Sequence, residues 1–181
     1  MGGACVPTLS QGLVQVYTGE GKGKTTAALG LVLRATGWGL CSYIAQFMKH
    51  QPTGEEEALK RLAPYVTLEK FGRPGFLAPG QCTPDDQALA QTGLAHARAA
   101  LLGGEYDLVV LDEVNTAVAF GLLSEQELLG LIAVRPPQVE LVLTGRGATP
   151  AILEQADLVT RMVEEKHPYQ RRIAARRGIE Y

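Results

Sequence analysis

The sequence has 181 residues, of which 46% are hydrophobic, and its 17 basic residues nearly balance its 19 acidic ones. A chain of this length can bury one sizeable core but hardly two, so we expect one domain over residues 1–181, with residues 1–12 flexible. The net charge of −2 provides no broad basic face for nucleic acid. No apolar stretch approaches membrane-spanning length, and the opening residues lack the features of a signal peptide. We therefore expect a cytoplasmic protein without nucleic-acid or membrane partners.

Short apolar runs alternate with helical patterns along the chain, as expected of β-α-β units. Several of these runs lack strict polar alternation, which is typical of parallel strands buried on both faces. The candidate strands are 13–17, 40–47, 66–71, 107–112, 139–144 and 157–163. The sequence therefore predicts an α/β fold in which helices flank a mostly parallel central sheet of about six strands.

Helix starts are marked by residues that cap the first turn. Some have the spacing of a capping box, in which side chains and backbone N–H groups bond reciprocally, and others place proline at the first helical position. These signals are Thr53 with Glu56, Thr83 before Pro84, Ser124 with Glu127, and Thr149 before Pro150. They predict helices near 54–63, 84–102, 124–134 and 150–156.

A glycine-rich loop lies between the first predicted strand and a helical pattern. Its sequence, TGEGKGKTT, matches the phosphate-binding pattern GxxxxGK[ST], except that Thr18 stands where the first glycine is expected. Because a strand precedes the loop and a helix follows it, we interpret the segment as a phosphate-binding loop.

The residue types in this loop suit an anionic ligand. Glycines allow backbone conformations that direct N–H groups toward phosphate oxygens, and the three in this loop are Gly19, Gly21 and Gly23. The helix expected to begin near Lys24 adds partial positive charge at its N-terminus. Lys24 can reach the outer phosphates, and the hydroxyl of Thr25 can ligate Mg²⁺.

A second motif, DLVVLDEVN, is an apolar strand that ends in two adjacent carboxylates, Asp112 and Glu113. At the carboxyl end of a parallel strand such acids lie in the ligand crevice, where they can hold Mg²⁺ directly or through water. Alone, the pair is a weak signal, because acids are common in turns. Beside the phosphate loop, it predicts a metal site made of Thr25, Asp112 and Glu113, and hence a Mg²⁺-nucleoside triphosphate site.

These residues do not decide how the nucleotide is used. Glu113 could orient water in a hydrolase or ligate metal in a transferase, so a P-loop ATPase or kinase is one alternative. Lys22 could stabilise charge on the phosphates or remain a solvated lysine. Arg146, after the strand 139–144, could contact phosphate or form a structural ion pair.

Four separated segments, TGEGKGKTTAALGLVLRATGWG, VVLDEVN, LTGRG and KHPYQRRIAARRGIEY, together resemble the ATP:corrinoid adenosyltransferase family of the cobalamin pathway. The resemblance runs from about Leu13 to Tyr181. It implies a RecA-like P-loop fold and transfer of the 5′-deoxyadenosyl group of ATP to the Co(I) of a reduced corrinoid, with Mg²⁺ assisting and triphosphate released. It also implies a homodimer and an electron donor, for which a reduced flavoprotein is a candidate. A nucleotide-dependent corrinoid-binding module without catalysis is the other alternative.

The resemblance also implies roles for individual residues. Lys24 and Glu113 are the expected catalytic residues, and Arg146 is a further ligand contact. Phe76, in the proline- and glycine-rich segment 72–84, matches one of two family aromatics that displace the lower axial ligand of the corrinoid, whereas Ala78 stands where the other, a tryptophan, is found. The triphosphate is expected to lie against Gly19, Glu20, Gly21, Lys22, Gly23, Lys24, Thr25 and Thr26.

Two further segments lie near the expected crevice. Lys49 and His50 follow the second predicted strand, and for both we favour a surface position over a role in catalysis. The basic tail, residues 166–177, matches the ending of the family, which suggests that it folds near the active site or the dimer contact.

Overall fold

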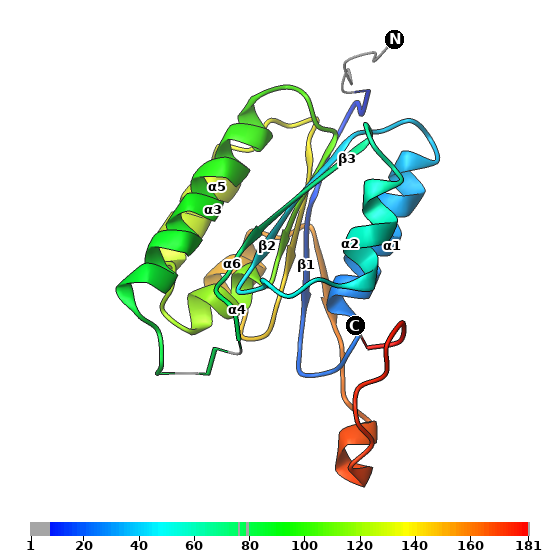
Figure 1. Cartoon of the computed structure of the whole chain (residues 1–181). Helices are drawn as coiled ribbons and strands as arrows, with labels where there is room; N and C mark the ends of the chain where they lie inside the picture. The colour runs from blue at the N-terminus through cyan, green and yellow to red at the C-terminus, as the bar shows by residue number, and fades with distance from the viewer. Residues whose placement is uncertain (1–7, 76, 79, 181) are drawn as a thin grey trace.

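The computed structural model describes residues 8–75, 77–78 and 80–180. Its centre is a sheet of six strands that pair in parallel in the order β3-β2-β4-β5-β1-β6 (Figure 1). All six predicted strands are confirmed, and their bounds are β1 Val14–Thr18, β2 Ser42–Phe47, β3 Val66–Phe71, β4 Leu108–Asp112, β5 Glu140–Thr144 and β6 Leu158–Arg161. β5 therefore separates β1, which precedes the phosphate loop, from β4, which ends in the acids.

Helices cover both faces of the sheet, so the described part of the chain has three layers (Figure 1). Helices α1 and α2 lie on one face, where a smaller apolar cluster forms around Ala28, Val32 and Val110. Helices α3 and α5 lie on the other face over the larger cluster, which includes Val109, Leu111 and Leu143. The helices are α1 Lys24–Thr36, α2 Gly54–Lys60, α3 Pro84–Leu102, α4 Val114–Ala119, α5 Glu125–Ala133, α6 Pro150–Glu154 and the 3-10 helix η1 Pro168–Arg171.

Three of the four predicted helix caps are confirmed. Ser124 caps α5 in a capping box with Glu127, and Thr149 caps α6 before a proline. Thr83 caps α3, and Asp86 completes a capping box there that the sequence reading missed.

The predicted capping box of Thr53 with Glu56 is wrong. Thr53 stands at the N-cap of α2, but its hydroxyl makes no hydrogen bond there. The Glu56 carboxylate lies 2.5 Å from the Lys70 ammonium on β3, and this opposite charge takes the carboxylate away from the helix terminus.

The structure also departs from the prediction in short segments. Helix α4 was not predicted, because it follows β4 without a loop and its sequence, VNTAVA, is rich in β-branched residues with low helix propensity. The N–H groups of Thr8 and Leu9 donate to Asp107, so part of the segment expected to be flexible is held against the sheet. Phe76 lies outside the described residues.

Candidate nucleotide site

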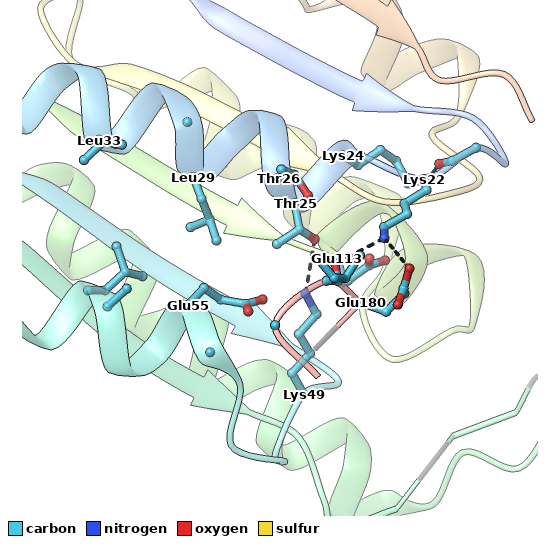
Figure 2. A pocket seen from close by; sticks show the side chains of 18 of the residues that line it. Lys22, Lys24, Thr25, Thr26, Leu29, Leu33, Lys49, Glu55, Glu113 and Glu180 are labelled. Carbon is cyan, nitrogen blue, oxygen red and sulfur yellow. Dashed lines mark hydrogen bonds and ion pairs between the residues drawn. The ribbon is translucent and has the colours of Figure 1, made fainter. Parts of the chain in front are cut away.

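A cavity of about 760 Å³ opens at the carboxyl ends of the strands, beside the loop that joins β1 to α1. Its walls combine residues 20–23 of that loop, the first turn of α1, the facing sides of α1 and α2, and the tail segment 178–180 (Figure 2). Seven of the eight residues expected to contact the triphosphate, Glu20 to Thr26, line this cavity, whereas Gly19 does not. The cavity is thus placed where ligands bind in open α/β sheets.

Close packing against the segment after β6 explains two of the loop glycines. A β-carbon on Gly19, whose φ is +96°, would lie 2.4 Å from the carbonyl oxygen of Met162, and one on Gly21 would lie 2.7 Å from the carbonyl carbon of Val163. The Gly21 N–H donates to the Met162 carbonyl at 2.8 Å. This N–H group therefore does not point toward a phosphate site, contrary to the expectation that all three glycines would direct N–H groups inward.

Lys24 begins α1, and its side chain folds back over the loop. Its ammonium donates to the carbonyl oxygens of Gly19 and Gly21 at 2.6 and 2.7 Å. Burial lowers the pKa of this ammonium, while the neighbouring carboxylate of Glu113 acts in the opposite direction. The ammonium therefore lies inside the curve of the loop, held by groups that a phosphate can replace.

Asp112 ends β4 and is almost fully buried, with 1% of its surface exposed. Its Oδ1 atom accepts hydrogen bonds from the hydroxyls of Thr25 at 2.8 Å and Thr144 at 2.7 Å. Its Oδ2 atom accepts from the Gln46 amide at 3.1 Å and the Lys49 ammonium at 2.6 Å. Asp112 therefore connects β4 to its neighbours β2 and β5 and to Thr25 at the start of α1.

Glu113 lies one residue further, at the wall of the cavity. It adopts a left-handed conformation with φ of +63° at the N-cap of α4, which is uncommon for a residue with a side chain. Its N–H donates to the Thr144 hydroxyl at 2.9 Å, and its carboxylate accepts from the Thr116 hydroxyl at 2.6 Å. These contacts fix the turn that separates the buried Asp112 from the exposed side of the site.

Arg146 and Lys22 form ion pairs at the mouth of the cavity. The Arg146 guanidinium lies 3.1 Å from the Glu20 carboxylate, and both side chains are exposed. The Lys22 ammonium lies 3.4 Å from the Glu180 carboxylate of the tail (Figure 2). Because exposed pairs of this kind contribute little to stability, both cations remain available to a ligand.

The tail returns to the site, as the match of its sequence to the family ending suggested. Gly178, Ile179 and Glu180 line the cavity, and the Ile179 carbonyl accepts from Lys22 at 3.3 Å. Hydrogen bonds from Arg176 lower the pKa of Glu180 to about 2, so its carboxylate is ionised at neutral pH.

Lys49 lies near the crevice as expected, but the expectation of a surface position was wrong. Its ammonium lies within the site, 2.6 Å from Asp112 and 3.2 Å from the Thr25 hydroxyl, whereas His50 is exposed and does not line the cavity. The available signal was its position just beyond β2, the strand that pairs directly with β4. Thr144 was also missed, because a threonine at a strand end is common and gives no signal of its own.

Away from the loop, the cavity continues between α1 and α2 along an apolar wall. Leu29 and Leu33 extend from α1 toward it, and Ala58, Leu59 and Leu62 line it from the side of α2 (Figure 2). A site with a polar end for phosphates and an apolar arm can hold a ligand that joins a charged chain to a flat ring system.

Comparisons with known proteins agree with this geometry. Residues 10–181 match the family described as ATP:corrinoid adenosyltransferase BtuR/CobO/CobP. Over 172 residues, the chain is 38% identical to a corrinoid adenosyltransferase of Pseudomonas aeruginosa, covering 94% of this chain and 84% of that protein. It is 36% identical to the corrinoid adenosyltransferase of Escherichia coli K12 over 172 residues, covering 94% of this chain and 86% of that protein.

A solved structure also resembles this one. A KaiC-like protein from Pyrococcus horikoshii superposes with a TM-score of 0.58 at 15% sequence identity, covering 91% of this chain and 82% of that chain. At this identity the likeness concerns the fold alone, and it confirms the predicted RecA-like architecture.

Proposed function

The chain belongs to the ATP:corrinoid adenosyltransferase family, so it transfers the adenosyl group of ATP to a corrinoid, and we propose that the cavity beside the phosphate loop is the site of transfer. The observation that carries this assignment is the meeting of Lys24 and Thr25 with Asp112 and Glu113 at one edge of the sheet. The triphosphate of ATP lies against residues 19–26, with Lys22 and Arg146 contacting it from the cavity mouth.

The oxygen atoms around Thr25 fit Mg²⁺. The Thr25 hydroxyl, the buried Asp112 and the cavity-lining Glu113 provide hard oxygen ligands, and the ammonium of Lys49 already lies against two of these groups. These oxygen atoms therefore form a site suited to a cation. Mg²⁺ bound there would neutralise charge that develops on the departing triphosphate.

The reaction needs positioning more than proton transfer. Co(I) is a nucleophile with no proton to lose, so a cobalt–carbon bond forms at C5′ as the C5′–oxygen bond breaks, and the electron pair leaves with the triphosphate. Lys24 meets the negative charge on the leaving group. Glu113 holds the metal side of the triphosphate in place.

Several partners complete the proposal. Phe76 would help to displace the lower axial ligand of the corrinoid, so that a reduced flavoprotein or a similar donor can reduce the cobalt. The chain forms one domain, and the protein acts as a homodimer in the cytoplasm.

No helix in the described part of the chain is both long and apolar enough to span a bilayer.

Identifying the inorganic product tests the proposal directly. The protein is incubated with ATP, Mg²⁺, a corrinoid and a reductant, and the products are separated by anion exchange. Triphosphate and an adenosylated corrinoid are expected in equal amounts. ADP or orthophosphate without adenosylation would identify an ATPase or kinase, and tight corrinoid binding without any product would identify a binding module.

A further inference from the structure

Lys49 places a positive charge where the nucleotide-bound metal is expected. It follows β2 by two residues, and its ammonium bridges the Thr25 hydroxyl and the Oδ2 atom of Asp112, at 3.2 and 2.6 Å. Figure 2 shows its side chain extending across the cavity toward the start of α1. The side chain is 27% exposed, whereas Asp112 beneath it is 1% exposed.

The directions of the hydrogen bonds show that this ammonium occupies an acceptor position on the Thr25 oxygen. The Thr25 hydroxyl donates its proton to Oδ1 of Asp112, so its oxygen is left to act as an acceptor or ligand. Lys49 donates to that oxygen. One of the two lone pairs with which Thr25 could ligate Mg²⁺ is therefore engaged by the Lys49 ammonium.

Asp112 is saturated in the same arrangement. Each of its oxygens accepts two hydrogen bonds, and only the one from Lys49 comes from a charged and partly exposed side chain. The donors Thr144 and Gln46 are fully buried. Lys49 is thus the partner that can leave without opening the core, and its flexible stem allows it to move.

We propose that Lys49 is a positioning residue that holds the metal site in its nucleotide-free state and is displaced when the metal-nucleotide complex binds. The ammonium neutralises the buried Asp112 and keeps the Thr25 hydroxyl oriented until Mg²⁺ replaces it. A metal ion on Thr25 and Asp112 would lie a few ångströms from the Lys49 ammonium, and the repulsion between the two cations makes them compete for the site. Lys49 has this role only if the cavity binds a metal-nucleotide complex, as the proposed function holds.

Divalent metal binding without nucleotide or corrinoid measures this exclusion. Mn²⁺ replaces Mg²⁺ as the probe, and the free ion is measured by electron paramagnetic resonance. Removal of a unit charge a few ångströms from the site strengthens cation binding, so Lys49→Met is expected to bind Mn²⁺ at least about tenfold more tightly than the wild type. Lys49→Gln keeps a hydrogen-bond donor, so it provides the same test if Lys49→Met does not fold. Its Mn²⁺ affinity should also increase.

Lys22→Met is the matched control, because Lys22 belongs to the same cavity but pairs with Glu180 rather than Asp112. Its Mn²⁺ affinity should stay close to that of the wild type. Adding Asp112→Asn to Lys49→Met should abolish the gain. Unchanged affinity in Lys49→Met, or an equal gain in Lys22→Met, would overturn the proposal.

The wild type provides a second measurement that needs no variant. Saturating Mg²⁺-ATP should change the rate at which Lys49 is acetylated by a lysine-selective reagent, measured by peptide mass spectrometry, while the rate at exposed Lys60 stays constant. An unchanged rate at Lys49 would also overturn the proposal. Neither readout depends on adenosyl transfer, so a cavity that binds Mg²⁺-ATP without transferring the adenosyl group would fail only in the product assay.

Discussion

The ammonium of Lys24 lies 2.6 Å from the carbonyl oxygen of Gly19, so the backbone of the loop holds this side chain in place. These contacts use one cation to satisfy two carbonyls of residues 19–21, and the same cation can turn to a phosphate with a small movement. We therefore expect Lys24 to act on the ligand more than on the fold.

Lys24→Ala should therefore abolish most activity and leave the protein folded. Losing one charge-stabilising group in a preorganised site costs on the order of 10²–10³ in turnover, and we expect a loss of at least this size. The rate of triphosphate release measures the loss, and circular dichroism checks the fold. Near-normal turnover in Lys24→Ala would remove this loop from the mechanism.

Glu113 has a left-handed backbone that favours glycine, whereas the proposed function needs its carboxylate. Alanine at this position keeps the strained φ of +63°, whereas glycine adopts it freely. Glu113→Gly should therefore be more stable than Glu113→Ala by about 1 kcal/mol. Both variants should be inactive, because both lose the carboxylate. Urea unfolding measures the difference. Equal stability of the two variants would mean that this backbone is not strained.

The sequence was sufficient to predict the sheet, because each of the six strands is a short apolar run bounded by turn residues. It also predicted that the glycine-rich loop, Asp112 and Glu113 would meet at one edge of the sheet, since local motifs specify them. It failed for Thr53, whose capping partner Glu56 is drawn away by Lys70 on a different element. Local spacing cannot report a competing charge that is distant in sequence.

Lys49 was assigned to the surface, and Thr144 was not predicted at all, for a related reason. Each is ordinary in its own segment, and each becomes part of the site only because β2 and β5 flank β4 in the sheet. Strand order is a property of the whole fold. The residues that surround a motif are therefore harder to predict than the motif itself.

Thr144 joins the two acids, and its removal should disturb both. Its hydroxyl donates to Asp112 and accepts from the Glu113 N–H, and the side chain is fully buried. Thr144→Val keeps the shape, but it leaves the Glu113 N–H without this acceptor and removes one of the two hydrogen bonds to Oδ1 of Asp112, which should cost about 1–3 kcal/mol of unfolding free energy. Misplacement of Glu113 should also lower kcat/KM by about tenfold or more.

Thr144→Ser is the control for this prediction, because it keeps the hydroxyl and removes only a methyl group. It should remain close to the wild type in activity, with a smaller loss of stability than Thr144→Val. Thermal unfolding and initial rates at several ATP concentrations provide both comparisons. Equal losses of activity in the two variants would show that packing, rather than the hydroxyl, matters at this position.

If Lys22 contacts the triphosphate as proposed, the tail carboxylate of Glu180 should compete with ATP for it. It lies 3.4 Å from the Lys22 ammonium at the mouth of the cavity, where a triphosphate would also place negative charge. Glu180→Gln removes this competing charge, so Mg²⁺-ATP should bind a few times more tightly, which isothermal titration calorimetry can measure. Glu105→Gln, a change at an exposed acid that does not line the cavity, should leave the affinity unchanged.

The pKa of Glu180 predicts how this effect depends on pH. Because the folded-state pKa is lowered from 4.5 to about 2, any stability that the carboxylate contributes is present above the ordinary value and is lost as the pH falls toward about 2. The group therefore stays ionised throughout the range in which the enzyme is assayed. The gain in affinity from Glu180→Gln should be the same at about pH 6 and about pH 8. A gain that fades toward pH 6 would mean that the carboxylate takes up a proton there, which the contacts with Arg176 and Lys22 should prevent.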